Sequence, residues 1–284
     1  MTARKLACII LAAGKGTRMK SALPKPLHEI AGRSMVGHVI AAAESLNPDK
    51  IVVVIGPDMP EMAEAVKPHA TAIQQVVNGT GGAALAAKGH FKNFDGDILI
   101  VFSDTPLVAG ETMQRMVELR RQIPAIGLVY SGFRPADPAK YGRMVMDDDG
   151  TLKKIVEFKD ATPDEKKITL CNGGIVCADG AKLFDWLAQV GNDNAQKEYY
   201  LTDIVEAAIR QGKKVTAYIA ANPIEALGIN TRAEMAEAER VLRGRVRQRL
   251  MDAGVTFLAP ETSFVDAGVK IGCDSVIHPH TDTL

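Results

Sequence analysis

Short apolar runs alternate with amphipathic stretches along the first half of the chain. The apolar runs predict strands at residues 7–12, 51–55, 73–77, 98–102 and 125–130. The stretches between them predict helices at residues 35–46, 59–66, 82–90 and 111–122. This alternation is typical of crossover units on a mostly parallel sheet with helices on both faces. We therefore predict an α/β fold with a Rossmann-like, doubly wound sheet, in which ligands lie at the carboxyl ends of the strands.

The regular alternation of predicted strands and helices ends at Tyr141. Two strand-like runs separated by a polar turn predict a hairpin, and they lie at residues 142–146 and 152–158. We interpret this hairpin as a small inserted lobe. The elements predicted after it are helices at 182–189 and 202–211 and a strand at 215–219.

The last part of the chain predicts a long helix followed by a six-residue repeat. Thr231 and Glu234 form a T-x-x-E capping box, and the helix that they start should end near Gly254. Beyond it, apolar residues recur every six positions, as in hexapeptide left-handed β-helices, at Val265, Ile271 and Ile277. Because a solenoid unit cannot bury its apolar face alone, we expect the rest of this domain to be missing. The predicted units are an α/β domain at 1–230, a connector helix at 231–254 and a truncated β-helix at 255–284.

Composition and charge narrow the class of protein. The 284 residues are 46% hydrophobic, which is enough for one large core. Lysine plus arginine and aspartate plus glutamate number 34 each, so no global field attracts nucleic acid or an anionic membrane. The apolar runs are too short to span a bilayer, and the first residues do not open a signal peptide. We expect a cytoplasmic protein without nucleic-acid or membrane partners.

The four cysteines lack C-x-x-C spacing, which favours buried reduced thiols over disulfides or a metal set. His278 and His280 have no third ligand nearby in the sequence, so a zinc site is not expected.

A glycine-rich turn follows the first predicted strand. Residues 11–26 read LAAGKGTRMKSALPKP, and Gly14 and Gly16 allow main-chain N–H groups to approach an anion closely. Four cations that can neutralise a triphosphate lie in the same segment, at Lys15, Arg18, Lys20 and Lys25. The Walker pattern is absent, and the dinucleotide pattern would need glycine in place of Met19. The segment predicts a phosphate-binding loop of another kind.

The pattern L-A-A-G-x-G-T-R-M followed by L-P-K-P-L resembles the sugar nucleotidyltransferases. Within them the chain is most similar to the uridylyltransferase half of the bacterial bifunctional proteins that make UDP-N-acetylglucosamine. Further segments that carry the resemblance are 74–81, 104–106, 141–142, 157–160, 172–174, 198–203 and 228–230. The resemblance implies Mg²⁺-dependent transfer of a uridylyl group from UTP to N-acetylglucosamine 1-phosphate, with release of pyrophosphate. The product would supply cell-wall and other envelope precursors. The resemblance also makes residues 1–230 a nucleotidyltransferase domain and the inserted hairpin lobe its sugar-binding part.

Asp104 follows the buried run 98–103, where a carboxylate either holds a cation or caps the next helix. The resemblance makes Asp104 a Mg²⁺ ligand, with Asn230 as the second protein ligand. It implies catalytic roles for Arg18, Lys25 and Asp104. The other implied substrate-binding residues are, for the nucleotide, Leu11, Ala12, Ala13, Gly14, Lys15, Gly16, Lys25, Gln74, Gly79 and Thr80, and, for the sugar and metal side, Gly142, Glu157, Asn172, Tyr199 and Asn230.

Several positions depart from the family pattern. They are Ser103 before the metal aspartate, Gly173-Gly174 after Asn172, and Val77 and Gly82 in the base-binding segment. Another base or another sugar 1-phosphate therefore stays open, as does a non-catalytic module that binds sugar nucleotides. A glycosyltransferase would need a D-x-D site, and Asp147-Asp148-Asp149 matches that spacing only within a turn.

The bifunctional proteins trimerise through the β-helix and carry acetyltransfer on that domain. We therefore expect this chain to be monomeric and to lack acetyltransferase activity.

Overall fold

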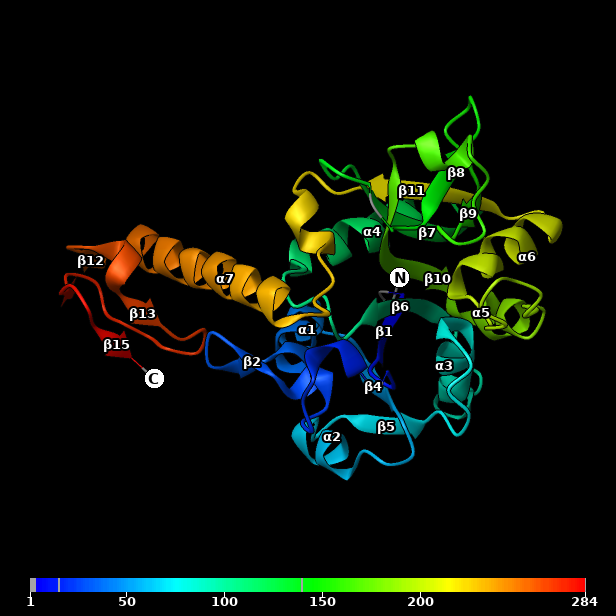
Figure 1. The fold of residues 1–284 in the computed structure, drawn as a ribbon. Helices are drawn as coiled ribbons and strands as arrows, with labels where there is room; N and C mark the ends of the chain where they lie inside the picture. The colour runs from blue at the N-terminus through cyan, green and yellow to red at the C-terminus, as the bar shows by residue number, and fades with distance from the viewer. Residues whose placement is uncertain (1–3, 15, 139, 284) are drawn as a thin grey trace.

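The fold is built on one twisted sheet with helices on both faces (Figure 1). It is seen in a computed structural model that describes residues 4–14, 16–138 and 140–283. The strands of the sheet are β1 (Lys5–Leu11), β4 (Lys50–Ile55), β5 (Ala70–Ile73), β6 (Gly96–Phe102), β7 (Ile126–Phe133), β8 (Arg143–Met146), β9 (Leu152–Val156), β10 (Cys171–Asp179) and β11 (Lys214–Ile219). The main helices are α1 (Met35–Glu44), α2 (Pro60–Ala65), α3 (Thr80–Ala86), α4 (Gly110–Gln122), α5 (Gly180–Leu187), α6 (Ile204–Arg210) and α7 (Arg232–Asp252).

The strand order is β11-β7-β10-β6-β1-β4-β5. β1 pairs in parallel with β4 and β6, β4 with β5, and β11 with β7, while β10 runs antiparallel to both of its neighbours. The predicted mostly parallel α/β sheet is therefore confirmed. The sequence did not predict β10, whose Gly173 and Gly174 are typical of a turn.

Buried side chains form one core on each face of the sheet. Alternation along β1 sends Ile9 to the core under α3, α5 and α6, and Ile10 to the core under α1, α2 and α4. Strands that are covered on both faces need continuous apolar runs, which explains the sequences of β1, β4 and β6.

The predicted strand at 73–77 is wrong in its extent. β5 ends at Ile73, and Gln74 turns inward with its side chain hydrogen-bonded to the loop that follows. Val76 and Val77 are 68% and 51% exposed, so these apolar residues do not continue the sheet. The polar contacts of Gln74 have overridden the apolar pattern.

Helix α7 runs away from the sheet and carries the C-terminal segment at its far end (Figure 1). Its capping box is present, because Thr231 accepts from the Glu234 N–H and Glu234 accepts from the Thr231 N–H. Beyond α7, β12 (Thr256–Phe257) pairs in parallel with β14 (Val276–Ile277), and β13 (Phe264–Val265) with β15 (Asp282–Thr283). The β-helix and the division of the chain into three units stay predictions.

Two further expectations concern cysteines and membranes. All four cysteines are free thiols, and three of them are buried, but Cys273 is exposed, contrary to the expectation of buried thiols. No helix in the described part of the chain combines the length and the apolar character that crossing a membrane requires.

Candidate active site

The loop after β1 and the loop after β6 lie at the same edge of the sheet. The two strands pair in register up to Leu11 and Phe102, and the next N–H, that of Ser103, donates to the Leu11 carbonyl at 3.0 Å. Parallel pairing therefore brings the glycine-rich loop and Asp104 together, although more than 80 residues of sequence separate Gly16 from Asp104. This is the edge at which the strand pattern predicts a ligand.

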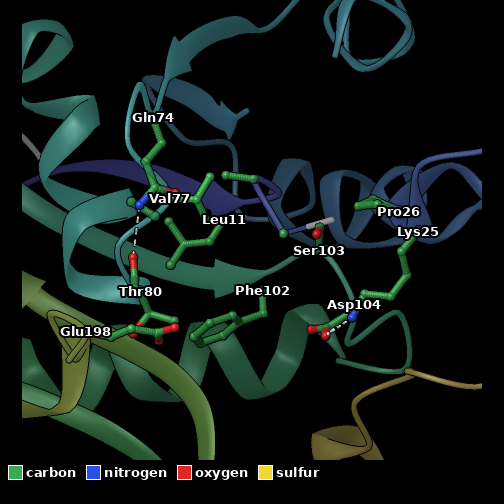
Figure 2. A pocket seen from close by; sticks show the side chains of 14 residues that line it. Leu11, Lys25, Pro26, Gln74, Val77, Thr80, Phe102, Ser103, Asp104 and Glu198 are labelled. Atoms are coloured by element: carbon green, nitrogen blue, oxygen red, sulfur yellow. Dashed lines mark hydrogen bonds and ion pairs between the residues drawn. The ribbon is translucent and has the colours of Figure 1, made fainter. Parts of the chain in front are cut away.

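A cavity of about 200 Å³ opens at this edge. The predicted residues that line it are Leu11, Ala13, Gly14, Lys25, Gln74, Gly79, Thr80 and Asp104. Figure 2 shows the Lys25–Asp104 pair at one end, Gln74, Thr80 and Glu198 at the other, and the apolar side chains of Leu11 and Phe102 between them. One charged end and one polar end joined by an apolar floor suit a ligand that has both a charged part and a flat part.

Two cations and two oxygen-bearing side chains meet at the charged end, which we call the phosphate end: Arg18, Lys25, Asp104 and Asn230. The Lys25 Nζ lies 2.5 Å from Asp104 Oδ2 and 3.0 Å from Asn230 Oδ1. The Arg18 Nη2 donates to the same Asn230 oxygen at 3.0 Å. Four residues from three separate segments of the sequence thus form one hydrogen-bonded group.

Glycine at position 16 allows the loop to pass close to Lys25. Gly16 has φ +61°, and a Cβ atom there would lie 2.4 Å from the Lys25 Cβ. Any larger residue would therefore clash as well as being strained. Ala12 is buried and fixes the start of the loop through its N–H, which donates to the Val54 carbonyl at 2.8 Å. Lys15, which we expect to support triphosphate binding, lies outside the described residues.

The polar end of the cavity is held by Gln74. Its side chain is buried, and Nε2 donates to Asn78 Oδ1 and to the Gly79 carbonyl, each at 3.1 Å. Gly79 has φ +109°, and a Cβ atom there would lie 2.6 Å from the Tyr199 carbonyl oxygen. The Thr80 hydroxyl accepts from the Leu201 N–H at 2.9 Å. The predicted base-binding segment is therefore clamped against residues 198–201.

The predicted sugar-binding residues form a second group, which we call the sugar end: Gly142, Glu157 and Asn172. None of them lines the cavity of the phosphate end. The Asn172 N–H donates to the Gly142 carbonyl at 2.9 Å, and a Cβ atom on Gly142 would lie 3.4 Å from both Glu157 carboxylate oxygens. Tyr199, the fourth predicted sugar-binding residue, lies beside the polar end instead, where its N–H donates to the Asn78 carbonyl at 2.8 Å.

Acidic groups with raised pKa values gather beside the sugar end. Burial raises the pKa of Glu157, and the nearby carboxylates of Asp203 and Asp160 add to the effect. Burial, Glu206 and Asp160 raise the pKa of Asp203 to about 6. Perturbed carboxyl groups beside a cleft are a common mark of a functional region, although structural clusters produce them too.

Glu198 is a residue of the cavity that the sequence did not single out. It lines the cavity at the polar end, near Thr80 in the view of Figure 2. The available signal was its place directly before Tyr199, in a segment that carries the family resemblance.

The donor set of the phosphate end fits a hard divalent cation. Asp104 Oδ2 and Asn230 Oδ1 both face the Lys25 ammonium, so a carboxylate and an amide oxygen already converge on positive charge. The described residues contain no cluster of three or more His, Cys, Asp or Glu that could enclose a metal ion. Two oxygen ligands without a cage suit a cation that is held mainly by substrate phosphates and water.

Comparison with known proteins agrees with this geometry. Residues 8–199 match the MobA-like NTP transferase domain. The chain is 45% identical over 280 residues to the "Bifunctional protein GlmU" of Paramagnetospirillum magneticum, covering 99% of this chain and 62% of that protein. It is 49% identical over 270 residues to the protein of the same name from Rhodospirillum rubrum, covering 95% of this chain and 60% of that protein. The chain thus spans about three fifths of the length of these relatives.

A solved structure shares the fold. A UDP-glucose pyrophosphorylase in complex with UDP-glucose matches with a TM-score of 0.67 and 16% identity, over 85% of this chain and 99% of that one. At this identity the likeness concerns the fold alone. Family membership rests on the domain match, which covers most of the chain: the chain belongs to the MobA-like NTP transferase family.

Proposed function

We propose that the chain is a UDP-N-acetylglucosamine pyrophosphorylase. It would transfer a uridylyl group from UTP to N-acetylglucosamine 1-phosphate in a Mg²⁺-dependent reaction and release pyrophosphate. The observation that carries the proposal is the phosphate end, where Lys25 contacts both Asp104 and Asn230 and Arg18 contacts Asn230. The names of the GlmU relatives and the family resemblance supply the choice of substrates.

The reaction is an in-line displacement at the α-phosphorus of UTP. A phosphate oxygen of the sugar 1-phosphate forms the new P–O bond, and the bond to the β-phosphate oxygen breaks. The attacking oxygen is already ionised, so no side chain has to remove a proton. The protein must mainly position two polyanions and offset their repulsion.

The residues of the phosphate end suit this task. Lys25 and Arg18 can donate to phosphate oxygens, and their present bonds to Asp104 and Asn230 hold both cations at the site before substrate arrives. Asp104 and Asn230 would hold Mg²⁺, which when bound supplies charge neutralisation for the triphosphate. Main-chain N–H groups of the glycine-rich loop add donors that need no reorganisation.

The polar end and the sugar end would set specificity. Gln74, fixed by Asn78 and Gly79, would recognise the uracil edge. Glu157 and Asn172 would bond to the hydroxyl and N-acetyl groups, and the Gly142 N–H would add a donor. The product would serve the synthesis of envelope polymers.

The test is pyrophosphate release from the purified protein with Mg²⁺. UTP, dTTP, GTP, ATP and CTP are each combined with the 1-phosphates of N-acetylglucosamine, glucose and galactose. We expect release with UTP and N-acetylglucosamine 1-phosphate, and the loss of that release when EDTA removes the metal. Another productive pair would overturn the choice of substrate but keep the displacement. A folded protein that binds UTP and releases nothing with any pair would overturn the enzymatic proposal in favour of a binding module.

A further inference from the structure

The carboxylate of Glu234 makes one more contact than a capping box requires. In such a box the acid at the third helical position reaches back to the N–H of the N-cap residue. Here Glu234 Oε2 accepts from the N-cap residue Thr231 at 2.9 Å, and also from Asn230 at 2.7 Å. The additional and shorter bond goes to the residue whose side chain belongs to the phosphate end.

Asn230 is held tightly on its other side as well. The N–H of the preceding residue, Ile229, donates to the Asp104 main-chain carbonyl at 2.8 Å, and Ile229 is fully buried. The Asn230 Nδ2 donates to the Gly228 carbonyl at 3.3 Å, which directs Oδ1 toward Lys25 and Arg18. The hydrogen bond from the Asn230 main-chain N–H to the Glu234 carboxylate connects this arrangement to helix α7.

We propose that Glu234 is a positioning residue, which fixes the Asn230 main chain so that its amide oxygen stays within reach of the cation that Asp104 holds. The inference rests on the proposed function, because it assumes that Asn230 binds the metal of that reaction. Glu234 itself would contact neither metal nor substrate. Groups that orient a metal ligand in this way typically contribute about 10-fold to 100-fold to metal affinity or activity.

Glu234 could instead serve only to begin the helix, and Thr231 provides the matched control for that possibility. The Thr231 Oγ1 accepts from the Glu234 N–H at 3.2 Å, so Thr231→Ala removes the other half of the same capping box. It leaves the N–H groups of residues 230 and 231 in place for the Glu234 carboxylate. Both Glu234→Ala and Thr231→Ala weaken the helix start, but only Glu234→Ala releases Asn230. Glu234→Gln retains an oxygen acceptor and tests for rescue.

The first measurement is metal affinity without turnover. Mn²⁺ binding is titrated by electron paramagnetic resonance in the presence of UTP and the absence of sugar 1-phosphate. We expect Glu234→Ala to weaken Mn²⁺ binding about 10-fold or more, with Glu234→Gln and Thr231→Ala within about threefold of wild type. Equal affinities in Glu234→Ala and Thr231→Ala would overturn the proposal, whether or not both variants lose thermal stability.

The second measurement needs no metal. Hydrogen exchange of the Asn230 amide in the free protein should accelerate in Glu234→Ala and not in Thr231→Ala. Unchanged protection in Glu234→Ala would also overturn the proposal. These readouts separate it from the proposed function: a wild-type protein that releases no pyrophosphate refutes the enzyme, whereas a turnover-competent protein with unchanged metal affinity in Glu234→Ala refutes only the role of Glu234.

Discussion

The phosphate end and the sugar end of the candidate site are held together in different ways. At the phosphate end, side chains from separate segments contact one another directly, and Lys25 is the centre of that group. At the sugar end, the main chain makes the connection, through the Asn172 N–H and the Gly142 carbonyl. Substitutions at the phosphate end should therefore disturb chemistry, whereas substitutions at the sugar end should disturb the shape of a binding surface.

The two ends also differ in the sign of their charges. The phosphate end holds two cations, Arg18 and Lys25, and one carboxylate, Asp104, which pairs with Lys25. Beside the sugar end, Glu157 and Asp203 are acids that burial and neighbouring carboxylates keep from ionising easily. Removing a carboxylate should thus have opposite consequences: it leaves a cation unpaired at the first end, and it relieves repulsion at the second.

The largest effect is expected from Asp104→Ala. This change removes the only carboxylate that contacts Lys25 in the described part of the chain, and with it the proposed charged metal ligand. We expect kcat/KM for pyrophosphate release to fall by about 10³-fold or more, while the circular dichroism spectrum stays that of wild type.

Asp148→Ala is the control for the Asp104 variant. Asp148 is an exposed carboxylate in the turn between β8 and β9, and it belongs to the formal D-x-D run. We expect less than about a twofold change in kcat/KM. Activity that survives in Asp104→Ala and is lost in Asp148→Ala would refute the metal site at the phosphate end and favour the glycosyltransferase interpretation.

Lys25→Ala should have the next largest effect. It removes the cation that bridges Asp104 and Asn230, so the developing charge on the phosphates loses a preorganised donor. We expect kcat to fall about 10²-fold to 10³-fold, measured as pyrophosphate release at saturating UTP.

Lys20→Asn is the matched control for Lys25→Ala, because Lys20 is an exposed cation of the same loop. Asparagine tolerates the positive φ of +49° at this position better than alanine does. We expect a loss of less than about fivefold. Equal losses in the two variants would show that the loop acts through its total charge rather than through the geometry of Lys25.

Gly142→Ala tests the sugar end and should act more weakly. The added Cβ would lie 3.4 Å from the Glu157 carboxylate and from Ile155, which is ordinary contact, so the fold should accept it. The methyl group would occupy space in which the sugar is proposed to lie. We expect KM for N-acetylglucosamine 1-phosphate to rise about 10-fold with KM for UTP unchanged. If KM for UTP rises instead, the sugar end and the phosphate end do not bind their two substrates independently.

The sequence could predict the edge where the site lies, but not its contacts. The buried runs of β1 and β6 identify them as parallel strands, and residues that follow such strands share one edge of the sheet. This reasoning places Asp104 beside the glycine-rich loop. It does not reveal that Lys25 lies between Asp104 and Asn230, because that contact depends on how the segment before α7 returns to Asp104, where the Ile229 N–H donates to the Asp104 carbonyl.

Two errors of local structure have different origins. Gly173 and Gly174 are typical of a turn, yet they lie in β10, where the pairing with β7 shifts in register between Asn172 and Val176. Residues 74–77 look like a strand, yet β5 ends at Ile73, and Gln74 and Val77 line the cavity. At β10 the distant strand β7 decides the conformation, and a local pattern carries no information about that partner. At Gln74 the buried side-chain amide, bonded to Asn78 and Gly79, outweighs the apolar pattern.

The smallest effect is expected from Asp203→Asn, and it concerns stability rather than turnover. The pKa of Asp203 is raised from 3.8 to about 6 in the folded protein. Below pH 4 the Asp203 carboxyl group is protonated in both the folded and the unfolded protein, so it does not lower the free energy of unfolding. As the pH rises through 6, the unfolded chain has already lost the proton that the folded protein retains, so the folded protein loses stability.

Asparagine removes that penalty. We therefore expect Asp203→Asn to raise the free energy of unfolding by about 1 kcal/mol at pH 8, a value reduced for partial exposure, and by much less at pH 4.5. Urea unfolding of both proteins across this range measures the difference. A gain that is equal at both pH values would point to packing instead of charge, and a loss at pH 8 would show that the Asp203 carboxylate is stabilised by its surroundings. Either result would remove the contrast in charge between the two ends of the site.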